Sequence, residues 1–407
     1  MKRLLLASLI LLTCACTRIS RASQEAPKPT ESFLLTFKMP EECLSTAKYK
    51  NRQVFLTGTA SYEYRTDVAG MLTVDGIIPG IYDIITNWEM SGAEFKKLVK
   101  DPAGIDDKAR VIVGVSLMNQ RLFQPQDMVI DLSAAIVRGL MISKIYYAGT
   151  KDDSARDYIA DSYVEIFNNS DEVLYLDGKY LALTESVSPA AYPANENPEY
   201  IYMRQICRFP GAGTQTAVQP GGSIVVAARS ARDHRESAAT SVDLSHADFE
   251  VKTMEGSGNP DVPMLPIVHN STKVAYLNLL SGGPNGVVLF EATQEEYDAW
   301  PEVYQIGKTS GELFKRVPKG AVIDGVECLK KPAQTAPDVN TKRLQQDVDA
   351  GFITITAVNG KNHESVERKV SRTQDGRCYL TDTNNSTADF VVLTDPTPQK
   401  YDKEGLL

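Results

Sequence analysis

Alternating apolar and polar positions mark a series of short strands in the first part of the chain. Residues 32–37 and 52–57 are rich in β-branched and aromatic residues and are bounded by turn formers, and residues 111–115 and 128–132 have the same character. In a strand, such alternation turns one face towards a core and the other towards solvent. We therefore predict a small β-sandwich over residues 31–135, close to the usual size of about 100 residues.

One interruption of this pattern has the signature of a helix start. Ser91 stands three positions before Glu94, and the apolar residues Phe95 and Leu98 follow. A serine at the N-cap and a glutamate three residues later satisfy backbone N–H groups reciprocally in a capping box. This spacing predicts one short helix over residues 92–100.

A second set of strands begins near Arg138. Residues 140–147 and 162–167 are strand-like, and a polar turn leads to a third strand within residues 173–181. In the second of these strands Val164 and Ile166 face one way, while Glu165 faces the other. The predicted fold class is therefore all-β, with two immunoglobulin-like β-sandwich domains.

Two turns in the first domain carry a family resemblance. The segment TDVAG at 66–70 suits a tight turn, and PGIY at 79–82 presets another turn before a strand. These segments reproduce the T-D-x-x-G and P-G-x-Y pattern of the carboxypeptidase-regulatory-like, transthyretin-like domain, which residues 31–135 therefore resemble. The resemblance implies a seven-stranded sandwich that acts as a structural spacer.

Segments of the second domain resemble the lamin-tail domain, an immunoglobulin-like sandwich. The resemblance begins with VEIFNNS at 164–170 and LYLDG at 174–178. It continues through PGGSIVV at 220–226, NGVVLF at 285–290, AVIDGV at 321–326, SVER at 365–368 and PTP at 396–398. Gln399 stands where the closing motif of that family has glycine. The resemblance spans residues 138–400 and implies a sandwich with long insertions that include short helices, at 184–218, 229–272 and 291–318.

Residues 1–15 resemble a bacterial lipoprotein signal peptide. A basic start precedes an apolar run at 4–12 that is too short to span a bilayer. Cys16 follows a small residue soon after that run, and the resemblance implies lipidation of Cys16, with Cys14 as the alternative acceptor. The other interpretation is a plain secretory signal with an incidental cysteine. Residues 16–30 are polar and are predicted to be a flexible tether.

Several acyl chains together hold a protein durably on a membrane. We therefore expect a lipid-anchored protein of the cell outer membrane, on its periplasmic or its surface face. The whole chain resembles an uncharacterised family of Bacteroidota lipoproteins that combines these two domain types. Members of that family are often encoded near TonB-dependent outer-membrane transporters, so the resemblance implies such a transporter as a partner.

Composition narrows the classes of function. The 407 residues contain 43 Lys and Arg against 52 Asp and Glu, so the formal net charge is −9. Because nucleic-acid binding depends on clustered positive charge, we expect no nucleic-acid partner. The chain has four histidines, which leaves few residues for a histidine-based metal or proton-transfer site.

The candidate catalytic and metal-binding motifs lack supporting context. Ser230, Asp233 and His234 have the residue types of a hydrolytic triad without a G-x-S-x-G turn. Residues 382–389 offer oxygen ligands of the kind that calcium uses, without the spacing of an EF-hand loop. For Glu165, between apolar neighbours, we expect a structural hydrogen bond to the backbone. We therefore expect no enzyme, no catalytic residue, no cofactor and no metal.

Four cysteines remain in the predicted domains: Cys43, Cys207, Cys328 and Cys378. An even number of cysteines in an exported protein permits disulfides. We predict a disulfide between Cys328 and Cys378, which lie in one C-terminal region. The alternative is that all four are small buried residues.

The predicted insertions carry clustered aromatic residues. Candidate binding residues in the first and third insertions are Tyr192, Tyr200, Tyr202, Tyr297, Trp300 and Tyr304. Thr293 and Glu296 form a second capping-box pattern beside the last three. Long loops on a rigid sandwich commonly build binding surfaces, and Tyr and Trp are frequent anchors there. The alternative is that these rings pack the insertions onto the sandwich.

These observations favour a non-enzymatic binding or accessory module that partners a TonB-dependent transporter in nutrient capture. A glycan, an iron chelate or a peptide is the expected ligand. The alternative is a structural or adhesive surface protein without a small-molecule ligand. A third hypothesis, a hydrolase, lacks a recognisable catalytic constellation.

Overall fold

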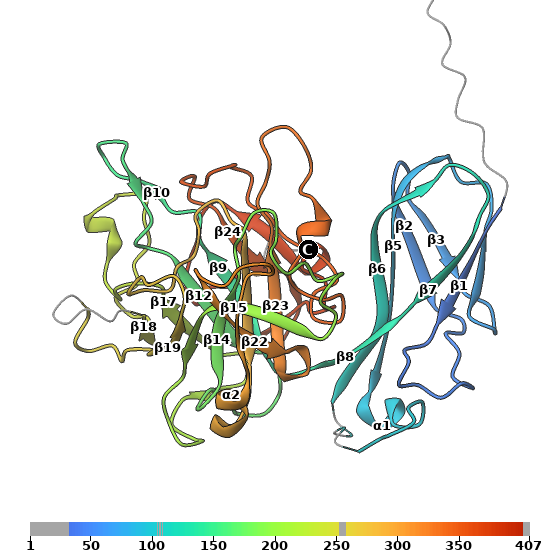
Figure 1. Ribbon diagram of the computed structural model, residues 1–407, viewed down its shortest axis with the longest axis horizontal. Coiled ribbons are helices and arrows are strands. Elements are labelled where there is room, and N and C mark those ends of the chain that lie inside the picture. The colour runs from blue at the N-terminus through green and yellow to red at the C-terminus, as the bar shows by residue number, and fades with distance from the viewer. Residues whose placement is uncertain (1–31, 104, 106, 108, 252–257, 402–407) are drawn as a thin grey trace, which may run out of the picture.

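Strands dominate the structure, a computed structural model that describes residues 32–401 except 104, 106, 108 and 252–257 (Figure 1). Helices are confined to short segments, so the predicted all-β fold class is confirmed. The strands form two separate sets of sheets. We call residues 33–137 the N-terminal domain and residues 140–401 the C-terminal domain.

The N-terminal domain packs a three-stranded sheet against a five-stranded sheet. The first has the order β4-β1-β7, with β1 (Phe33–Lys38), β4 (Met71–Val74) and β7 (Asp127–Asp131). The second has the order β3-β2-β5-β6-β8, with β2 (Gln53–Gly58), β3 (Tyr62–Arg65), β5 (Gly80–Ser91), β6 (Arg110–Leu122) and β8 (Ser133–Val137). The described part of this domain thus has eight strands, β1 to β8, where the resemblance implied seven.

The predicted alternation places the apolar face of each strand in this core. Phe33, Leu35 and Phe37 of β1 are buried, and Leu34 and Thr36 between them are partly exposed. β1 pairs antiparallel with β4 and parallel with β7. The two sheets enclose one apolar cluster that also contains residues of β2, β5 and β6.

The motif turn at 66–70 is closed by the Asp67 side chain. One Asp67 carboxylate oxygen accepts the backbone N–H groups of Ala69 and Met71, each at 2.8 Å. Gly70 has a φ of +84°, a conformation that glycine adopts without a Cβ penalty. Thr66, in the same turn, is buried and donates its hydroxyl to the carbonyl of Tyr49 at 2.5 Å.

The first helix is shorter than the sequence predicted. α1 (Gly92–Phe95) has the expected capping box between Ser91 and Glu94. It does not continue to residue 100, because residues 96–98 form turns and Val99 makes an isolated β-bridge with Cys43. That bridge fixes the segment in an extended conformation against the core.

A six-stranded sheet forms one layer of the C-terminal domain. Its order is β18-β17-β12-β9-β24-β27, with β9 (Leu140–Tyr146), β12 (Tyr163–Asn168), β17 (Ser223–Ala227), β18 (Phe249–Glu250), β24 (Ser365–Arg368) and β27 (Phe390–Leu393). Every residue of β9 and of β12 is buried, because both lie inside this sheet and both faces are covered.

A seven-stranded sheet forms the facing layer. Its strands run in the order β21-β22-β15-β14-β20-β23, and β19 also pairs with β15. The bounds of these strands are β14 (Tyr180–Thr184), β15 (Tyr200–Arg208), β19 (Ile267–Asn270), β20 (Asn285–Phe290), β21 (Glu302–Tyr304), β22 (Leu313–Pro318) and β23 (Val322–Cys328). The main apolar cluster of the domain lies between the two layers and includes Ile142, Val164, Val226, Leu181 and Val287.

Part of the predicted first insertion belongs to this sheet. β15 pairs with β14, β22 and β19, and residues Ile201–Cys207 are buried. The expectation that residues 184–218 lie outside the sandwich is therefore wrong for β15. The loop at 185–199 that precedes β15 matches the expected insertion.

Short elements decorate the C-terminal domain. They comprise the paired strands β10 (Thr150–Lys151) and β11 (Asp157–Tyr158), β13 (Leu174–Tyr175) and β16 (Ala217–Val218), and β25 (Val370–Gln374) and β26 (Arg377–Leu380). Helix α2 (Gln294–Ala299) starts at the predicted capping box of Thr293 and Glu296, and helix α3 (Ser386–Asp389) follows Asn385. Three 3₁₀ turns lie at η1 (His234–Glu236), η2 (Lys319–Ala321) and η3 (Val339–Thr341).

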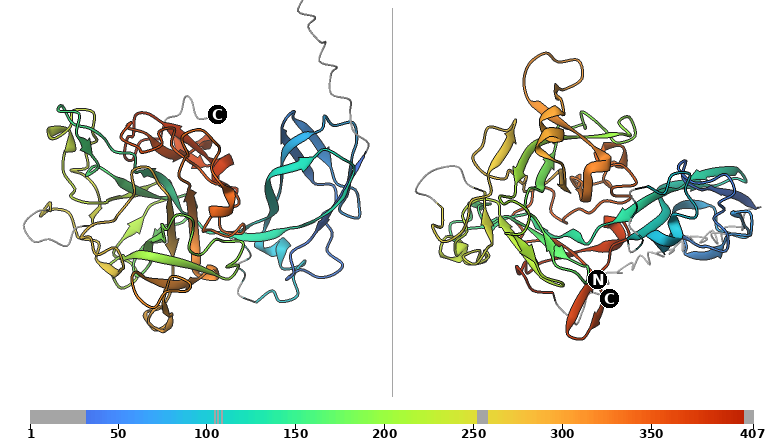
Figure 2. Two further views of the ribbon diagram at one scale, coloured as in Figure 1. Left: turned by 45° about the horizontal axis from the view of Figure 1, so that its top comes forward. Right: turned by 90° about the horizontal axis from the view of Figure 1, so that it is seen from below.

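The two domains lie side by side and are joined by a short linker (Figures 1 and 2). β8 ends at Val137 and β9 begins at Leu140. β6 of the N-terminal domain faces the C-terminal domain (Figure 2, left). The two domains touch at Ser116 of β6, which accepts hydrogen bonds from Gln346 and Asn385. No helix among the described residues has the length and apolar character needed to cross a membrane.

Candidate functional site

A groove of about 450 Å³ lies between the two domains. The N-terminal domain contributes Ser116, Leu117, Met118 and Ser133. The C-terminal domain contributes Ala194, Asn195, Pro198, Lys319, Val339, Asn340, Lys342, Leu344, Gln345, Gln346, Asp347 and Ala350. Its volume lies within the range of small-ligand sites, and sites between domains are common.

A second hollow of about 640 Å³ surrounds the linker. Several of its charged groups are engaged in ion pairs, such as those of Glu291 with Arg138 and Lys179. The first groove has fewer charged lining residues, Lys319, Lys342 and Asp347, among amide, hydroxyl and apolar side chains. We therefore treat the first groove, called the inter-domain groove below, as the candidate site.

One wall of the groove is the part of β6 that extends beyond its partner strand. β8 pairs with β6 only from Arg110 to Gly114. Ser116 lies just past this point and accepts two hydrogen bonds from the C-terminal domain. The Gln346 amide donates to its carbonyl at 3.4 Å, and the Asn385 amide donates to its hydroxyl at 3.0 Å.

Buried carboxylates fix the other wall. Glu327 is fully buried and accepts the backbone N–H groups of Arg343 and Leu344 at 2.7 and 2.8 Å. Asp349 accepts the N–H groups of Glu327 and Gly351 at 2.8 and 2.9 Å. Burial raises the pKa of Glu327. The segment that lines the groove is thus held by side chains behind it.

Gly351 is required by this arrangement. A Cβ at this position would lie 2.0 Å from the Oδ1 atom of Asn385 and 2.7 Å from the backbone nitrogen of Thr387. The close approach allows the groove wall to pack directly against the segment that contacts Ser116.

The two lysines of the groove are already engaged. Lys319 forms an ion pair with Asp347 at 2.9 Å. The Lys342 ammonium donates a hydrogen bond to the carbonyl of Asp349 at 2.5 Å. Burial lowers the pKa of Lys342. The carboxylates of Asp349 and Glu327 favour its charged form.

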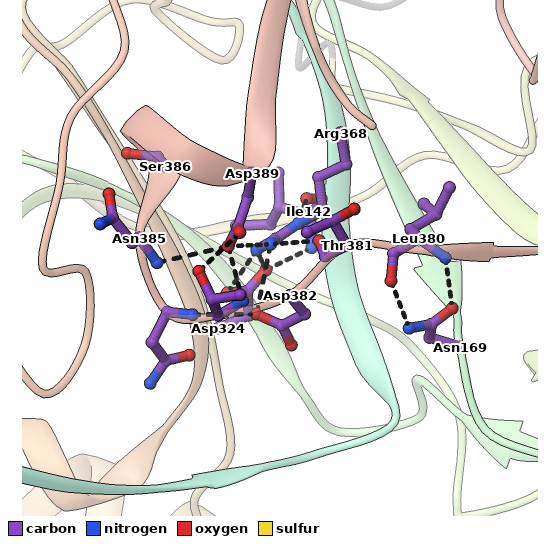
Figure 3. Close-up of polar contacts among 12 residues, drawn as sticks. Ile142, Asn169, Asp324, Arg368, Leu380, Thr381, Asp382, Asn385, Ser386 and Asp389 are labelled. Atoms are coloured by element: carbon purple, nitrogen blue, oxygen red, sulfur yellow. Dashed lines mark hydrogen bonds and ion pairs between the residues drawn. The ribbon is translucent and has the colours of Figure 1, made fainter. Parts of the chain in front are cut away.

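A buried charge cluster lies behind the segment that contacts Ser116 (Figure 3). Arg368 is 2 % exposed, and its guanidinium contacts three carboxylates. The distances are 2.9 Å to Asp324, 3.2 Å to Asp382 and 3.2 Å to Asp389. Asp324 also accepts the backbone N–H of Ile142 at 2.6 Å. The cluster therefore joins β9, β23, β24 and the segment 382–389.

One guanidinium cannot neutralise three buried carboxylates. Burial raises the pKa of Asp324 to about 7 and that of Asp389 to about 6, although Arg368 opposes both shifts. The three carboxylates in turn raise the pKa of Arg368 despite its burial. Asp324 and Asp389 of the cluster therefore retain protons up to near-neutral pH.

The cluster positions the contact between the domains. Asp389 accepts the backbone N–H groups of Thr383 and Asn385 at 2.8 and 3.3 Å. Asn385 is the residue whose amide reaches Ser116, and the neighbouring Ser386 donates its hydroxyl to Asp349 at 2.6 Å. The charge cluster, the groove wall and the inter-domain contact are thus one connected network.

The loop at 382–389 is therefore occupied by protein partners. Its carboxylates bind Arg368, and Asn385 caps α3 by accepting the N–H groups of Thr387 and Ala388. No group of three or more His, Cys, Asp or Glu side chains in the described part of the chain is placed to hold a metal ion.

Most of the predicted aromatic binding residues pack against the sandwich. Tyr192 stacks on Tyr202 with ring centroids 3.6 Å apart, and Phe314 meets Tyr192 edge-on at 6.1 Å. The Tyr192 hydroxyl also donates to the carbonyl of Tyr304. Tyr192 and Tyr202 are buried, which agrees with the packing interpretation.

The aromatic residues of the third insertion behave similarly. Tyr297 stacks on Tyr180 at 4.8 Å, and Trp300 lies 5.8 Å from Phe290 and 6.2 Å from Tyr297. Tyr200 and Tyr304 keep 36 % and 38 % of their surface exposed. None of the six predicted residues lines the inter-domain groove as described, and a binding role for them stays a prediction.

His234, the histidine of the candidate triad, has structural partners. His234 contacts the carbonyl of Ser230 through Nε2 at 2.9 Å and the hydroxyl of Tyr158 through Nδ1 at 2.7 Å. Its ring therefore does not meet the Ser230 hydroxyl as a triad requires. Burial lowers the pKa of His234 to about 4. Asp233 pairs with Arg235 at 2.7 Å.

Glu165 has the structural role that the sequence suggested. It is fully buried and accepts the backbone N–H of Gln399 at 2.9 Å. The Tyr401 hydroxyl donates to it at 2.7 Å. The carboxylate therefore secures the end of the described chain against β12.

The predicted disulfide between Cys328 and Cys378 is wrong. Both thiols are free, as are those of Cys43 and Cys207. Cys328 ends β23 in the main apolar core, whereas Cys378 lies on the β25–β26 hairpin in a separate small cluster. The alternative of small buried residues describes Cys43, Cys207 and Cys328, and Cys378 is half-buried.

The predicted lipidation site, Cys16, lies outside the described residues, as do the signal peptide and nearly all of the tether. No sequence pattern predicts the residues that line the groove. They come from three distant stretches, at 116–133, 194–198 and 319–350, and no local motif marks them. The open length of β6, a 13-residue strand whose neighbour has five residues, is visible only in the assembled sheet.

Together, these features define a class: an all-β protein of two sandwiches that share a groove. Residues 219–397 match a family described as "Protein of unknown function (DUF4876)". The chain is also similar to the crystal structure of a DUF4876 family protein from Bacteroides thetaiotaomicron. The TM-score is 0.57 at 22 % identity, over 92 % of this chain and 99 % of that chain. At this identity the likeness shows a shared fold.

No curated protein matches the chain. The two matches agree with the expectation of an uncharacterised family found in Bacteroidota. The assignment of the two domains to the transthyretin-like and lamin-tail-like types stays a prediction.

Proposed function

We propose that this protein is a lipid-anchored envelope protein that binds a ligand or partner without catalysing a reaction. In this proposal it sits on the outer membrane through Cys16 and assists a TonB-dependent transporter in nutrient capture. The observation that carries the binding role is the inter-domain groove, because both domains build it.

Pre-organisation of the groove supports this role. Glu327 and Asp349 hold the backbone of one wall, and Ser116 of the other wall is tied to it through Gln346 and Asn385. A site whose walls are already ordered loses less entropy on binding. Such construction suits recognition by shape and hydrogen bonding.

The sequence before the first domain supports the anchor. Cys16 would carry the lipid, and residues 16–30 would separate it from β1. The N-terminal domain would then act as a spacer that holds the groove away from the membrane surface.

The test is affinity purification of the full-length lipoprotein from membranes, with identification of the proteins that co-purify. We expect an outer-membrane transporter to co-purify with the wild type. Ala194→Trp places a large side chain in the groove and should reduce this recovery. Ala239→Trp, at an exposed position away from the groove, is the matched control.

Two further results would decide against parts of the proposal. Unchanged palmitate labelling of Cys16→Ala would show that Cys16 is not the acceptor. Equal recovery of the transporter with both tryptophan variants would show that the groove takes no part in the interaction. Cell-surface adhesion without any bound transporter or nutrient would favour the structural or adhesive alternative.

A further inference from the structure

The inter-domain groove runs along an open strand edge. β6 spans Arg110–Leu122, and β8 covers its outer side only as far as Gly114. Beyond that point no strand of the described chain pairs with β6 on this side. Ser116, Leu117 and Met118 of this open stretch line the groove. Unpaired strand edges present N–H and C=O groups that can pair with an added strand.

Side-chain amides now occupy two carbonyl groups of this open stretch. The Gln120 amide donates to the carbonyl of Met118 at 2.8 Å, and the Gln346 amide reaches Ser116. The Gln346 amide donates to the carbonyl of Ser116 at 3.4 Å, the upper limit of a hydrogen bond. A side-chain amide at this place imitates the N–H of a neighbouring strand. Because the hydrogen bond from Gln346 to Ser116 is long, the N–H of an incoming peptide can replace it at a small cost in free energy.

The chemistry of the walls matches an uncharged peptide. Lys319 forms an ion pair with Asp347, and Lys342 donates a hydrogen bond to the carbonyl of Asp349. Both described lysines of the groove therefore already have partners, and the groove does not favour an anionic ligand. The remaining lining consists of amides and hydroxyls, which pair with peptide groups, and of apolar side chains such as Leu117 and Val339.

The same lining argues against a sugar ligand. Large aromatic faces are effective binding surfaces for flat apolar ligand faces. No described residue of the groove is aromatic, and the tyrosines and Trp300 of the insertions lie elsewhere. Hydrogen bonding to an extended main chain uses the open edge of β6 directly.

We propose that the inter-domain groove binds an extended, uncharged peptide segment of a partner protein, which adds as a strand to the open edge of β6 beyond Gly114. This proposal rests on the binding role above and names the chemistry of the partner. Main-chain hydrogen bonds supply most of the affinity in this mode, so it tolerates many side chains.

The test uses fluorescein-labelled heptapeptides of alternating Thr and Val in both registers, blocked at both ends. Fluorescence anisotropy with the whole chain should show saturable binding by at least one register. The same peptides with N-methyl groups on alternate residues lack the N–H groups that pair with β6. We expect N-methylation and Ala194→Trp each to weaken binding about tenfold or more, and Ala239→Trp to leave it unchanged. Melting curves of both variants establish that each is folded.

Equal affinity for the N-methylated peptides would overturn the proposal, because binding would not use the strand edge. Absence of binding by either register at millimolar concentration would also overturn it. Binding of maltohexaose but not of the peptides would make the groove a glycan site. If the peptides fail while Ala194→Trp still removes a partner from purified membranes, the binding role stands and only the peptide chemistry is wrong.

Discussion

Both domains bury side chains between two layers of β-sheet, but they differ in how many charged side chains they bury. In the described part of the N-terminal domain, the buried polar side chains are Thr66, Thr86 and Ser116, and none is charged. The C-terminal domain buries many charged side chains, among them Lys144, Glu165, Arg204, Asp324, Glu327, Arg343, Asp349, Glu367, Arg368, Asp382 and Asp389. The larger domain therefore relies on internal ion pairs and hydrogen bonds where the smaller one relies on apolar packing.

The difference follows the connectivity of the chain. In the N-terminal domain, short turns join most of the strands, and alternation alone specifies which face is buried. In the C-terminal domain, irregular segments must be fixed onto the sheets, and their backbone groups need partners. Glu327, Asp349 and Asp389 each accept two or more backbone N–H groups from such segments. Buried charge here specifies where loops lie.

The largest expected effect comes from removing the central cation of the charge cluster. Arg368→Met should lower the free energy of unfolding of the C-terminal domain by about 3–5 kcal/mol, because three buried carboxylates lose their counter-ion. Urea unfolding can follow each domain separately, since the two tryptophans, Trp88 and Trp300, lie in different domains. The Trp88 signal should not shift.

Arg372→Met is the matched control for this change, because Arg372 is exposed on the β25–β26 hairpin and stacks on Tyr379 at 3.9 Å. It should alter stability by less than about 0.5 kcal/mol. Similar stability of Arg368→Met and Arg372→Met would mean that the buried charges contribute no specific stabilisation.

The second prediction concerns apolar packing in the N-terminal domain. Leu56 is fully buried, and Leu56→Ala should lower the stability of this domain by about 3 kcal/mol through lost burial and a residual cavity. Leu44→Ala, at a side chain that is 41 % exposed, should have little effect. The Trp88 transition should move and the Trp300 transition should stay. A joint shift of both transitions would show that the domains unfold as one cooperative unit.

The third prediction distinguishes packing from binding for the insertion aromatics. Trp300 is half-buried between Phe290 and Tyr297, and Trp300→Ala should lower the stability of the C-terminal domain by about 2 kcal/mol. Tyr304→Ala, at a more exposed ring, should cost less than about 0.5 kcal/mol. Thermal melting followed by circular dichroism measures both, because Trp300→Ala removes the tryptophan signal of the C-terminal domain. Unchanged stability of Trp300→Ala combined with lost partner recovery from membranes would favour the binding role.

The last expected effect is a pH dependence that belongs to the C-terminal domain. The pKa of Asp324 is raised to about 7, above its ordinary value, so its contribution to stability is complete below about pH 4 and is lost as pH rises through 7. The slope for one proton is at most about 1.4 kcal/mol per pH unit. Urea unfolding between pH 5 and pH 7.5 should show this slope in the Trp300 signal.

Asp324→Asn should flatten that slope, because the asparagine does not titrate. Its destabilisation relative to the wild type should therefore shrink as pH rises. The Trp88 signal provides the internal control, since the N-terminal domain has no buried charge in its described part. An identical slope in the variant would assign the pH dependence to other groups.

Local signals in the sequence predicted much of the fold. Alternation located β1 and β2, the capping boxes at Ser91 and Thr293 located α1 and α2, and the polar position at Glu165 indicated a structural hydrogen bond. Each of these depends on residues close together in the chain. The predicted disulfide had no such basis, because sequence separation does not tell where two cysteines lie in space.

The groove depends on relations that no local pattern contains. Ser116 faces Gln346 and Asn385 across more than two hundred residues. The resemblance to the lamin-tail domain places β15 in an insertion, because residues 184–218 are part of the length that exceeds that domain. The burial of β15 on both faces is a property of the assembled sheet.

The ribosome synthesises the chain from its N-terminus, and this order gives the pairing of β9 with β24 a further consequence. All described strands of the N-terminal domain precede residue 138, so this domain can fold while the rest of the chain is still being synthesised. β9 follows directly, yet it pairs with β24, whose residues Ser365–Arg368 come more than two hundred positions later. Until then the buried, largely apolar edge of β9 is uncovered, and such an edge is prone to aggregation. The C-terminal domain is therefore expected to be the slow-folding part of the chain and the part most dependent on chaperones.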